Sequence, residues 1–290
     1  MKFIREASDL HLDWDVEGFH RTRILDRSKP PIRDAMDLVW YPVSLSDDLD
    51  TTFIIAGDIW LEGRFATRKN ADGDTWIMVM SRRFKYIVLV LGNHDYWSRN
   101  VLYEADKVKE YFKEQGLTNV FLLEKDAVVL DQVKFIGGTL WTDYHRHDPM
   151  VMYAAPRLLK DYDYIRYGKS YRRIRVTDLY EIHQNTKSFI FEHAKRDYPE
   201  QKIVVVTHMA PSFNSVAPHY RQAHWLQMNF LYYTDMETRI MADGQEIDLW
   251  FHGHMHHSID YMIGNVKVIL NARGYATENE KFDSTLQIPV

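Results

Sequence analysis

The chain has 290 residues, 46% of them hydrophobic and 27% charged, and it carries a formal net charge of −5. This composition is that of an ordinary globular protein with enough apolar residues for a large core. The lack of cysteine excludes disulfides, thiolate metal ligands and a cysteine nucleophile, so any metal site must use nitrogen and oxygen.

The N-terminus lacks the long apolar segment of a signal peptide, and the longest clean apolar run, residues 86–91, is too short to cross a bilayer. We therefore expect a cytoplasmic protein without a membrane partner. The negative net charge provides no general attraction to nucleic acid, although a local basic patch could provide one. The oligomeric state is left open.

Apolar and β-branched runs predict eight strands, at residues 3–7, 52–56, 86–91, 127–130, 134–136, 203–206, 249–251 and 267–270. Apolar residues spaced three to four apart predict two helices, over 100–115 and 177–198. Gly116 ends the first helix and Pro199 the second. Strands alternating with helices in the first half indicate βαβ-type units.

Two stretches look like insertions into a single domain that spans residues 1–290: one at about 14–50, the other at about 141–176. The first contains Pro30 and Pro31 and is longer than a crossover requires. The second is rich in tyrosine and arginine and has no core-strand pattern. Loops of this length are uncommon unless they are functional. We interpret the second as a partly ordered cap over a site.

Five short polar clusters each follow an apolar run: Asp9-Leu10-His11, Gly57-Asp58, Gly92-Asn93-His94-Asp95, Thr207-His208 and Gly253-His254-Met255-His256. The loop at the C-terminal end of a buried strand holds its side chains on a rigid frame. Residues two apart in an extended segment share a face, so each Asp-x-His or His-x-His pair can point to one centre. Together the clusters form a plausible cage for two metal ions.

The residue types of the cage limit the choice of metal. Asp58 has a carboxylate that can bridge two cations, and Asn93 offers a carbonyl oxygen without adding charge. Mixed imidazole and carboxylate ligation suits Mn, Fe, Zn, Co or Ni better than Ca or an all-oxygen Mg site. We therefore expect two divalent transition-metal ions, with Mn favoured.

The order and spacing of the clusters resemble those of the calcineurin-like metallophosphoesterases over nearly the whole chain. The similarity is closer to a bacterial and phage-type subgroup of uncharacterised members, through these runs: Gly138-Thr139-Leu140-Trp141-Thr142-Asp143, Asp161-Tyr162, Ile165-Arg166, Thr207-His208-Met209-Ala210-Pro211-Ser212 and Asn271-Ala272-Arg273-Gly274-Tyr275. The chain departs from the family twice. No further acidic residue follows Asp58 closely, and Met209 stands where many relatives carry a second histidine.

The resemblance implies an α/β fold, a four-layer αββα sandwich in which helices flank two mixed β-sheets. It implies two metal sites that share Asp58 as a bridge: Asp9, His11 and His256 hold one ion, and Asn93, His208 and His254 hold the other. His94 would be the acid that protonates the leaving oxygen, and Asp95 would orient the His94 ring.

Two cations roughly 3.5–4 Å apart can clamp a phosphoryl group and supply a bridging hydroxide for in-line attack. The predicted function is therefore a dinuclear-metal phosphoesterase, with diesters favoured and nucleotides, cyclic nucleotides or nucleic-acid ends as substrates. A phosphomonoesterase or protein phosphatase is the first alternative. The second is a scaffold that kept the fold and lost catalysis, which the retention of every ligand and of His94 disfavours.

Three further residues are candidates for substrate binding: Arg166, Arg273 and His252. Arg166 lies in a basic, tyrosine-rich stretch at 157–175, which could bind phosphates and bases or could be a solvated surface. Arg273 could brace a loop or touch substrate. For His252 we favour a supporting role behind the ligands, and we interpret His183 as a packing or capping residue.

Overall fold

The computed structural model describes residues 1–290 except 16–38, 61–64, 66–67, 223–225 and 276–277. Much of the predicted insertion at 14–50, including Pro30 and Pro31, therefore lies outside the described residues. The described part contains two large β-sheets, both of mixed strand direction. In that part no helix is long and apolar enough to span a membrane.

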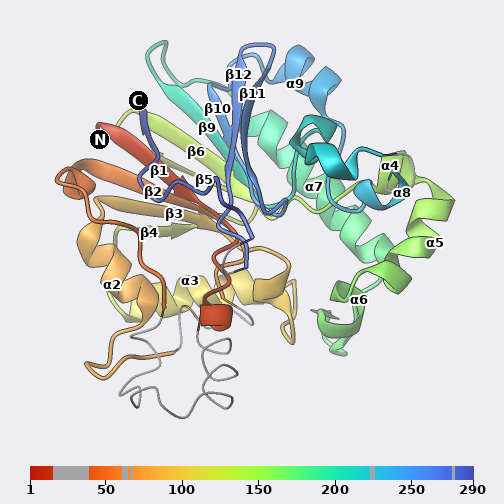
Figure 1. The fold of residues 1–290 in the computed structure, drawn as a ribbon, viewed down its shortest axis with the longest axis horizontal. Helices are drawn as coiled ribbons and strands as arrows, with labels where there is room; N and C mark the ends of the chain where they lie inside the picture. The colour runs from red at the N-terminus through yellow and green to blue at the C-terminus, as the bar shows by residue number, and fades with distance from the viewer. Residues whose placement is uncertain (16–38, 61–64, 66–67, 223–225, 276–277) are drawn as a thin grey trace.

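The first sheet has the strand order β13-β1-β2-β3-β4. Its bounds are β1 (Phe3–Ala7), β2 (Thr51–Ala56), β3 (Tyr86–Val90), β4 (Val120–Leu122) and β13 (Gln287–Pro289). Strands β1 to β4 run parallel, and β13 pairs antiparallel with β1, which brings the two ends of the chain together (Figure 1).

The second sheet has the strand order β11-β12-β10-β9-β6-β5. Its bounds are β5 (Asp126–Leu130), β6 (Val133–Gly138), β9 (Lys202–Thr207), β10 (Leu249–Phe251), β11 (Ser258–Ile263) and β12 (Val266–Asn271). Strands β6, β9, β10 and β12 are parallel, and hairpins add β5 and β11 at the two edges.

Continuous apolar strands are explained by burial on both of their faces. In β2, Ile54 and Ala56 belong to a core between the sheets, whereas Phe53 and Ile55 belong to the core under the helices. Strands β3 and β9 divide their side chains in the same way. Because successive side chains point to opposite faces, each strand contributes to two apolar layers.

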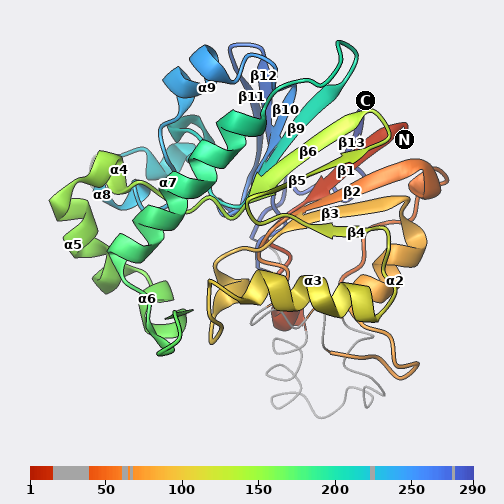
Figure 2. The same cartoon turned by 180° about the vertical axis from the view of Figure 1, so that it is seen from behind.

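Helices cover the outer faces of the two sheets, as Figures 1 and 2 show. Helices α2 (Trp76–Arg83) and α3 (Glu104–Glu114) pack on the first sheet, and α7 (Val176–His193) and α9 (Glu237–Asp243) pack on the second. This arrangement is the predicted four-layer αββα sandwich, which is confirmed.

The stretch at 141–176 is more ordered than the sequence suggests. It contains α4 (Tyr144–His147), α5 (Pro149–Leu158), α6 (Asp161–Tyr164) and a small hairpin of β7 (Arg166–Tyr167) and β8 (Arg172–Arg173). It lies beside α7, together with α8 (Leu226–Asn229) (Figure 1). We call residues 141–175 the cap segment.

The predicted strands all occur within one or two residues of their expected bounds, but other elements were missed. Among the missed strands, β11 is an edge strand with partly exposed residues, and β4 and β13 are only three residues long. The helix expected at 100–115 begins at Glu104, and the one expected at 177–198 ends at His193.

Candidate metal centre

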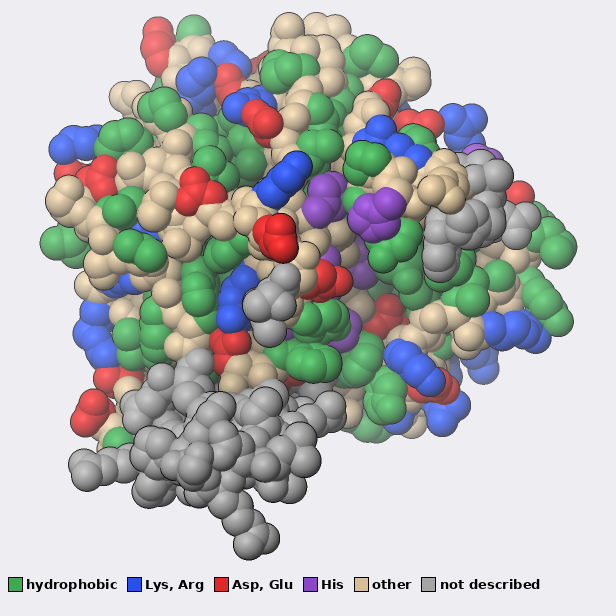
Figure 3. Space-filling view, in the orientation of Figure 1, with side chains coloured by type: hydrophobic (Ala, Val, Ile, Leu, Met, Phe, Trp, Pro, Cys, Tyr) green, Lys and Arg blue, Asp and Glu red, His purple; other side chains and the backbone are tan. Residues whose placement is uncertain are grey.

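The candidate ligands lie on five loops at the C-terminal ends of parallel strands β1, β2, β3, β9 and β10: Asp9, His11, Asp58, Asn93, His208, His254 and His256. The two sheets meet at this end, where Ser8 after β1 forms a β-bridge with Ala272 after β12. This junction places loops from both sheets side by side. Figure 3 shows histidine side chains gathered near the middle of this face.

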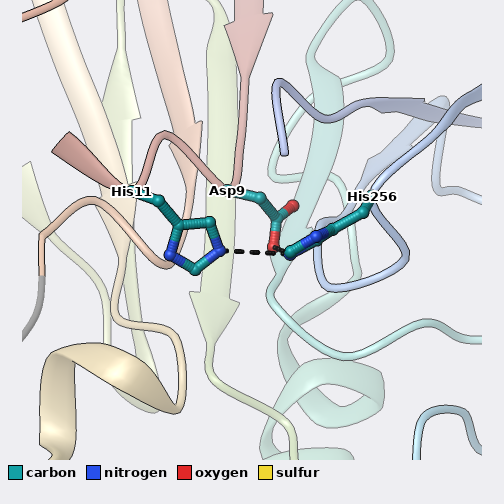
Figure 4. Close-up of side chains that lie close together, drawn as sticks. All are labelled: Asp9, His11 and His256. Carbon is teal, nitrogen blue, oxygen red and sulfur yellow. Dashed lines mark hydrogen bonds and ion pairs between the residues drawn. The ribbon is translucent and has the colours of Figure 1, made fainter. Parts of the chain in front are cut away.

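Asp9, His11 and His256 form what we call the first ligand group. One nitrogen or oxygen from each residue lies within 4.8 Å of the other two. The Nε2 atoms of His11 and His256 are 3.1 Å apart, and Asp9 Oδ1 is 3.5 Å from His256 Nε2. Figure 4 shows the three side chains converging on one point, as the ligands of a metal ion do.

Asn93, His208 and His254 form the second ligand group. Asn93 Oδ1 lies 3.0 Å from His208 Nε2. Ligand atoms of Asp58, His208 and His254 also lie within 4.8 Å of one another. Asp58 Oδ2 is 3.5 Å from His208 Nε2 and 3.9 Å from His11 Nε2, so this one oxygen faces both groups.

The donor set fits divalent cations bound by nitrogen and oxygen. His254 Nε2 is buried and has no hydrogen-bond partner among the described residues. A buried polar atom of this kind needs a partner, which a bound cation would provide. Imidazole and carboxylate ligands together suit Mn, Fe, Zn, Co or Ni.

Hydrogen bonds behind the histidines orient their ligand nitrogens. His208 Nδ1 lies 2.8 Å from the Ala56 carbonyl oxygen, and His256 Nδ1 lies 2.7 Å from Glu278 Oε2. Because these acceptors take the Nδ1–H, the Nε2 lone pair of each ring is left for a ligand bond. Glu278 was not identified from the sequence, which offers no motif around it.

The backbone of the ligand loops adopts unusual conformations. Asp9, His11, Asp58, His254 and His256 all have φ between 42° and 72°. Non-glycine residues rarely adopt this region, and such residues gather at functional sites where the surrounding structure holds them. Five of the seven candidate ligands therefore sit on strained backbone that the surrounding structure holds in place.

The glycines of the motifs are required by close packing against ligands. A Cβ atom on Gly92 would lie 2.1 Å from Asp58 Oδ1, and one on Gly57 would lie 2.4 Å from His208 Nδ1. Both distances are far below van der Waals contact. The Gly-Asp and Gly-Asn-His-Asp motifs therefore keep glycine because a neighbouring ligand occupies the space of its side chain.

The two carboxylates among the candidate ligands, those of Asp9 and Asp58, remain ionised. Burial alone would raise the pKa of Asp9, but the hydrogen bond and charge of His256 lower it to about 2. Burial is likewise outweighed at Asp58, where the charges of His208 and His94 hold the pKa well below its usual range. Ionised carboxylates at the centre attract cations.

The histidines divide into two kinds. Burial lowers the pKa of both His11 and His254 to about 3, so their rings are neutral, as metal ligation requires. Burial opposes the charge on His208 and His256 too, but Asp58 raises the pKa of His208 to about 9, and Asp9 and Glu278 raise that of His256 to about 10. Cations bound here would compete with these two protons.

His94 lies beside His11 and Asp58 at the centre. Its ring nitrogen is within 4.8 Å of ligand atoms of His11 and Asp58, and its side chain is only partly buried. The ring stacks on Trp97, with centroids 4.2 Å apart and 17° between the planes. Trp97 was not singled out from the sequence.

Asp95 does not take the expected position beside the His94 ring. Its buried carboxylate accepts backbone N–H groups from Gly92, Ile59 and Trp60, and no described contact joins it to the imidazole. Burial, with the nearby charge of Asp58, raises its pKa to about 8. Asp95 ties the loops after β2 and β3 together, and its role as the orienter of the His94 ring stays a prediction.

Aromatic rings cover two further histidines of the centre. Tyr275 stacks on His11 with centroids 4.2 Å apart, and Tyr232 stacks on His254 at 5.1 Å. Tyr275 ends the sequence run that begins at Asn271, which could have indicated a place at the site. Nothing in the sequence singled out Tyr232.

The three candidate substrate residues have other partners in the structure. The Arg273 guanidinium pairs with Asp15 at 2.7 Å and donates to the Leu10 carbonyl, so it braces the loop that carries Asp9 and His11. Arg166 donates to the Asp163 carbonyl.

His252, the third candidate, is fully buried and lies 2.8 Å from Ser215 Oγ. The contacts of all three residues are with other parts of the protein, so each residue supports a neighbouring segment. Binding of substrate by the three residues stays a prediction.

Comparisons with known proteins place this geometry in a family. A sequence model of the family described as calcineurin-like phosphoesterase matches residues 7–258. A protein of Acanthamoeba polyphaga mimivirus, named uncharacterized protein L509, is 22% identical over 303 residues, covering 100% of this chain and 97% of its own.

Among solved structures, the phosphopantetheinyl hydrolase of Mycobacterium tuberculosis matches with a TM-score of 0.62 at 16% identity. The match covers 99% of this chain and 95% of the other, and it shows the same fold. Since the family match includes most of the sequence and all the candidate ligands, the chain belongs to the calcineurin-like phosphoesterases, which hydrolyse phosphate esters with the aid of metal ions.

Proposed function

We propose that this protein is a phosphodiesterase with a dinuclear metal centre. The observation that carries the proposal is the overlap of three clusters of ligand atoms, which share His11 and Asp58. The first ligand group would hold one ion, the second ligand group the other, and Asp58 would bridge them. Mn²⁺ is the favoured metal, with Fe, Zn, Ni or Co as alternatives.

Two bound cations would offset the charge of a phosphate ester. They would also lower the pKa of a nearby water, so that hydroxide is available to attack phosphorus. The protein supplies the remaining chemistry. His94 stands beside His11 and Asp58 with its ring partly exposed, so it can donate a proton to the leaving oxygen. The stack on Trp97 keeps the plane of the imidazole fixed during that transfer.

The charges around the site favour a diester over a monoester, which carries more negative charge. The described arginines on segments bordering the centre already have partners: Arg99 pairs with Glu104, and Arg273 pairs with Asp15. A monoester would gain from a free guanidinium fork, which these residues do not offer. Nucleotides, cyclic nucleotides and nucleic-acid ends remain the proposed substrates.

The test is Mn²⁺-dependent hydrolysis of bis-p-nitrophenyl phosphate beside p-nitrophenyl phosphate, with Asn93→Ala as the blank. We expect higher kcat/KM for the diester. Cyclic nucleotides, short oligonucleotides and a phosphopantetheinyl ester, the last suggested only by the name of the structural neighbour, complete the panel. A consistent monoester preference would instead support a phosphomonoesterase or protein phosphatase.

The role of His94 has its own test. His94→Ala should lose roughly 10²–10⁴-fold in kcat on esters with poor leaving groups, as loss of a general acid does. The loss should be much smaller for p-nitrophenolate, which needs little protonation. An equal loss on both kinds of substrate would contradict the role of proton donor.

The scaffold alternative makes a different prediction about metal. The conjunction of all seven candidate ligands in one centre supports catalysis, because a scaffold has no need to keep them together. A purified protein that takes up no Mn²⁺, Fe²⁺ or Zn²⁺ in equilibrium dialysis would support the scaffold instead.

A further inference from the structure

The cap segment places one buried carboxylate behind the candidate metal centre. Asp161, the first residue of α6, is only 4% exposed. Its Oδ1 accepts the Asn93 Nδ2–H at 3.0 Å and the Trp97 Nε1–H at 2.7 Å. Both donors belong to the loop after β3, more than sixty residues earlier in the chain. One oxygen thus holds two side chains of a loop that also carries His94.

The first bond decides which end of the Asn93 amide faces the centre. An asparagine side chain has one oxygen and one NH₂ group of nearly equal shape, and only the oxygen can ligate a metal. Because Nδ2 donates to Asp161, Oδ1 points the other way, 3.0 Å from His208 Nε2. Without this acceptor, the amide could rotate and turn its NH₂ group toward the cations.

The second bond fixes the ring that supports His94. Trp97 lies between two other rings: His94 stacks on one side at 4.2 Å, and Tyr164 stacks on the other at 4.8 Å. The indole N–H bond to Asp161 prevents the middle ring from turning. Asp95 is engaged with backbone amides, so the imidazole plane is supported by this stack and by an edge contact with the His11 ring.

We propose that Asp161 is a positioning residue, which selects the ligand oxygen of Asn93 and holds the Trp97 ring against His94. The proposal has two parts. The part that concerns His94 rests on the proposed function, whereas the part that concerns Asn93 depends only on metal binding. The carboxylate behind the centre would thus come from the cap segment, because no further acidic residue follows Asp58 closely in the Gly-Asp motif.

The test compares three variants with the wild-type protein: Asp161→Ala removes both bonds, Asp161→Asn keeps an acceptor oxygen, and Trp97→Phe removes only the indole donor. Asp163→Asn is the matched control, because Asp163 lies in the same helix but is half exposed and paired with Arg173. Mn²⁺ binding is followed by calorimetry, and turnover is followed on esters of increasing leaving-group pKa.

Asp161→Ala should bind one of two Mn²⁺ ions 10–100-fold more weakly, the size typical of outer-shell changes, and leave the other ion unaffected. Its turnover should fall more steeply as leaving groups become poorer. Asp161→Asn should recover most of both properties. Trp97→Phe should retain wild-type Mn²⁺ affinity and show only the steeper leaving-group dependence.

If Asp161→Ala kept the Mn²⁺ affinity and the leaving-group dependence of the wild-type protein, the proposal for Asp161 would be overturned. The proposed function would be unaffected by that result. If Asp161→Ala fails to fold, Trp97→Phe still tests the support of His94, because an unchanged leaving-group dependence there would overturn that part of the proposal. A wild-type protein that binds Mn²⁺ but hydrolyses no ester would refute the proposed function, and the calorimetry would still test the Asn93 orientation.

Discussion

The two ligand groups of the centre share Asp58 but are held in different ways. In the first group, His256 keeps 19% of its side chain exposed and is oriented by Glu278, which is 45% exposed. In the second, Asn93 and His208 are buried and are oriented by Asp161 and a backbone carbonyl. Partners that are themselves fixed allow fewer alternative positions, so we expect the second group to bind its ion more tightly.

The two ligand groups also differ in their place in the fold. His256 lies on a partly exposed loop, and Tyr275 stacks on the buried His11. The second group lies where β3, β9 and β10 end, and Asn93 is bonded to Asp161 of the cap segment. We therefore expect the two sites to bind their ions with unequal strength, because the contacts behind the ligands differ. Four predictions test this comparison.

The largest effect is expected from Asp58→Asn, which should remove the difference between the groups by weakening both. The amide cannot supply the charge that one oxygen of Asp58 presents to His208 and to His11. We expect a fall in kcat/KM well beyond the 10–100-fold typical of outer-shell changes. Equilibrium dialysis with Mn²⁺ should show weaker binding of both ions, and unchanged binding of either would contradict the shared role.

Gly92→Ala should disturb the centre from the backbone side. The new Cβ would lie 2.1 Å from Asp58 Oδ1, so the carboxylate must move. We expect activity to fall roughly 10²-fold, by analogy with small displacements of reacting groups. Gly73→Ala is the control, since nothing lies within 4 Å of its Cβ and its strained φ affects stability alone. Equal activity in the two variants would contradict the packing argument.

Glu278→Gln should separate the two groups. It weakens the bonds from His256 and from the Tyr275 N–H, both beside the first group, so one Mn²⁺ ion should bind about 10–100-fold more weakly while the other is retained. Calorimetry at two metal concentrations can resolve the binding of the first Mn²⁺ ion from that of the second. The neighbouring exposed Glu280→Gln is the control. If both ions weakened together in Glu278→Gln, the two groups would not be independent.

The smallest effect concerns the anchoring of the cap segment and depends on pH. His183 on α7 is fully buried, and its Nδ1 donates to the Leu140 carbonyl at 3.0 Å, just before the cap segment. Burial lowers its pKa to about 3, from 6.5 for a free histidine. Between these values the unfolded chain binds a proton that the folded chain does not, so stability rises with pH.

Consequently His183 costs no stability above pH 6.5, and the free energy of unfolding falls by up to about 1.4 kcal/mol for each pH unit below it. His183→Asn keeps a donor for Leu140 but cannot titrate, so its stability should fall less steeply. Urea denaturation in EDTA from pH 7 to pH 4 measures both slopes. Parallel slopes would show that His183 does not couple the cap segment to pH.

The sequence alone determined the strands and the candidate ligands. Buried parallel strands carry their signal locally, as uninterrupted β-branched runs, and the ligand motifs directly follow them. The four-layer sandwich was also predictable, through the resemblance that those motifs carry. Short edge strands such as β4 and β13 were missed, because three residues contain too little pattern to be distinguished from a loop.

Only the tertiary structure decided what supports the ligands. Asp161 meets Asn93 across 68 residues, and Arg273 reaches Leu10 across 263. Asp95, which stands next to His94 in the sequence, turns to backbone amides of another loop instead. Ligand identity is encoded in short motifs, whereas hydrogen-bond partners depend on which loops the two sheets bring together, and no local pattern specifies that.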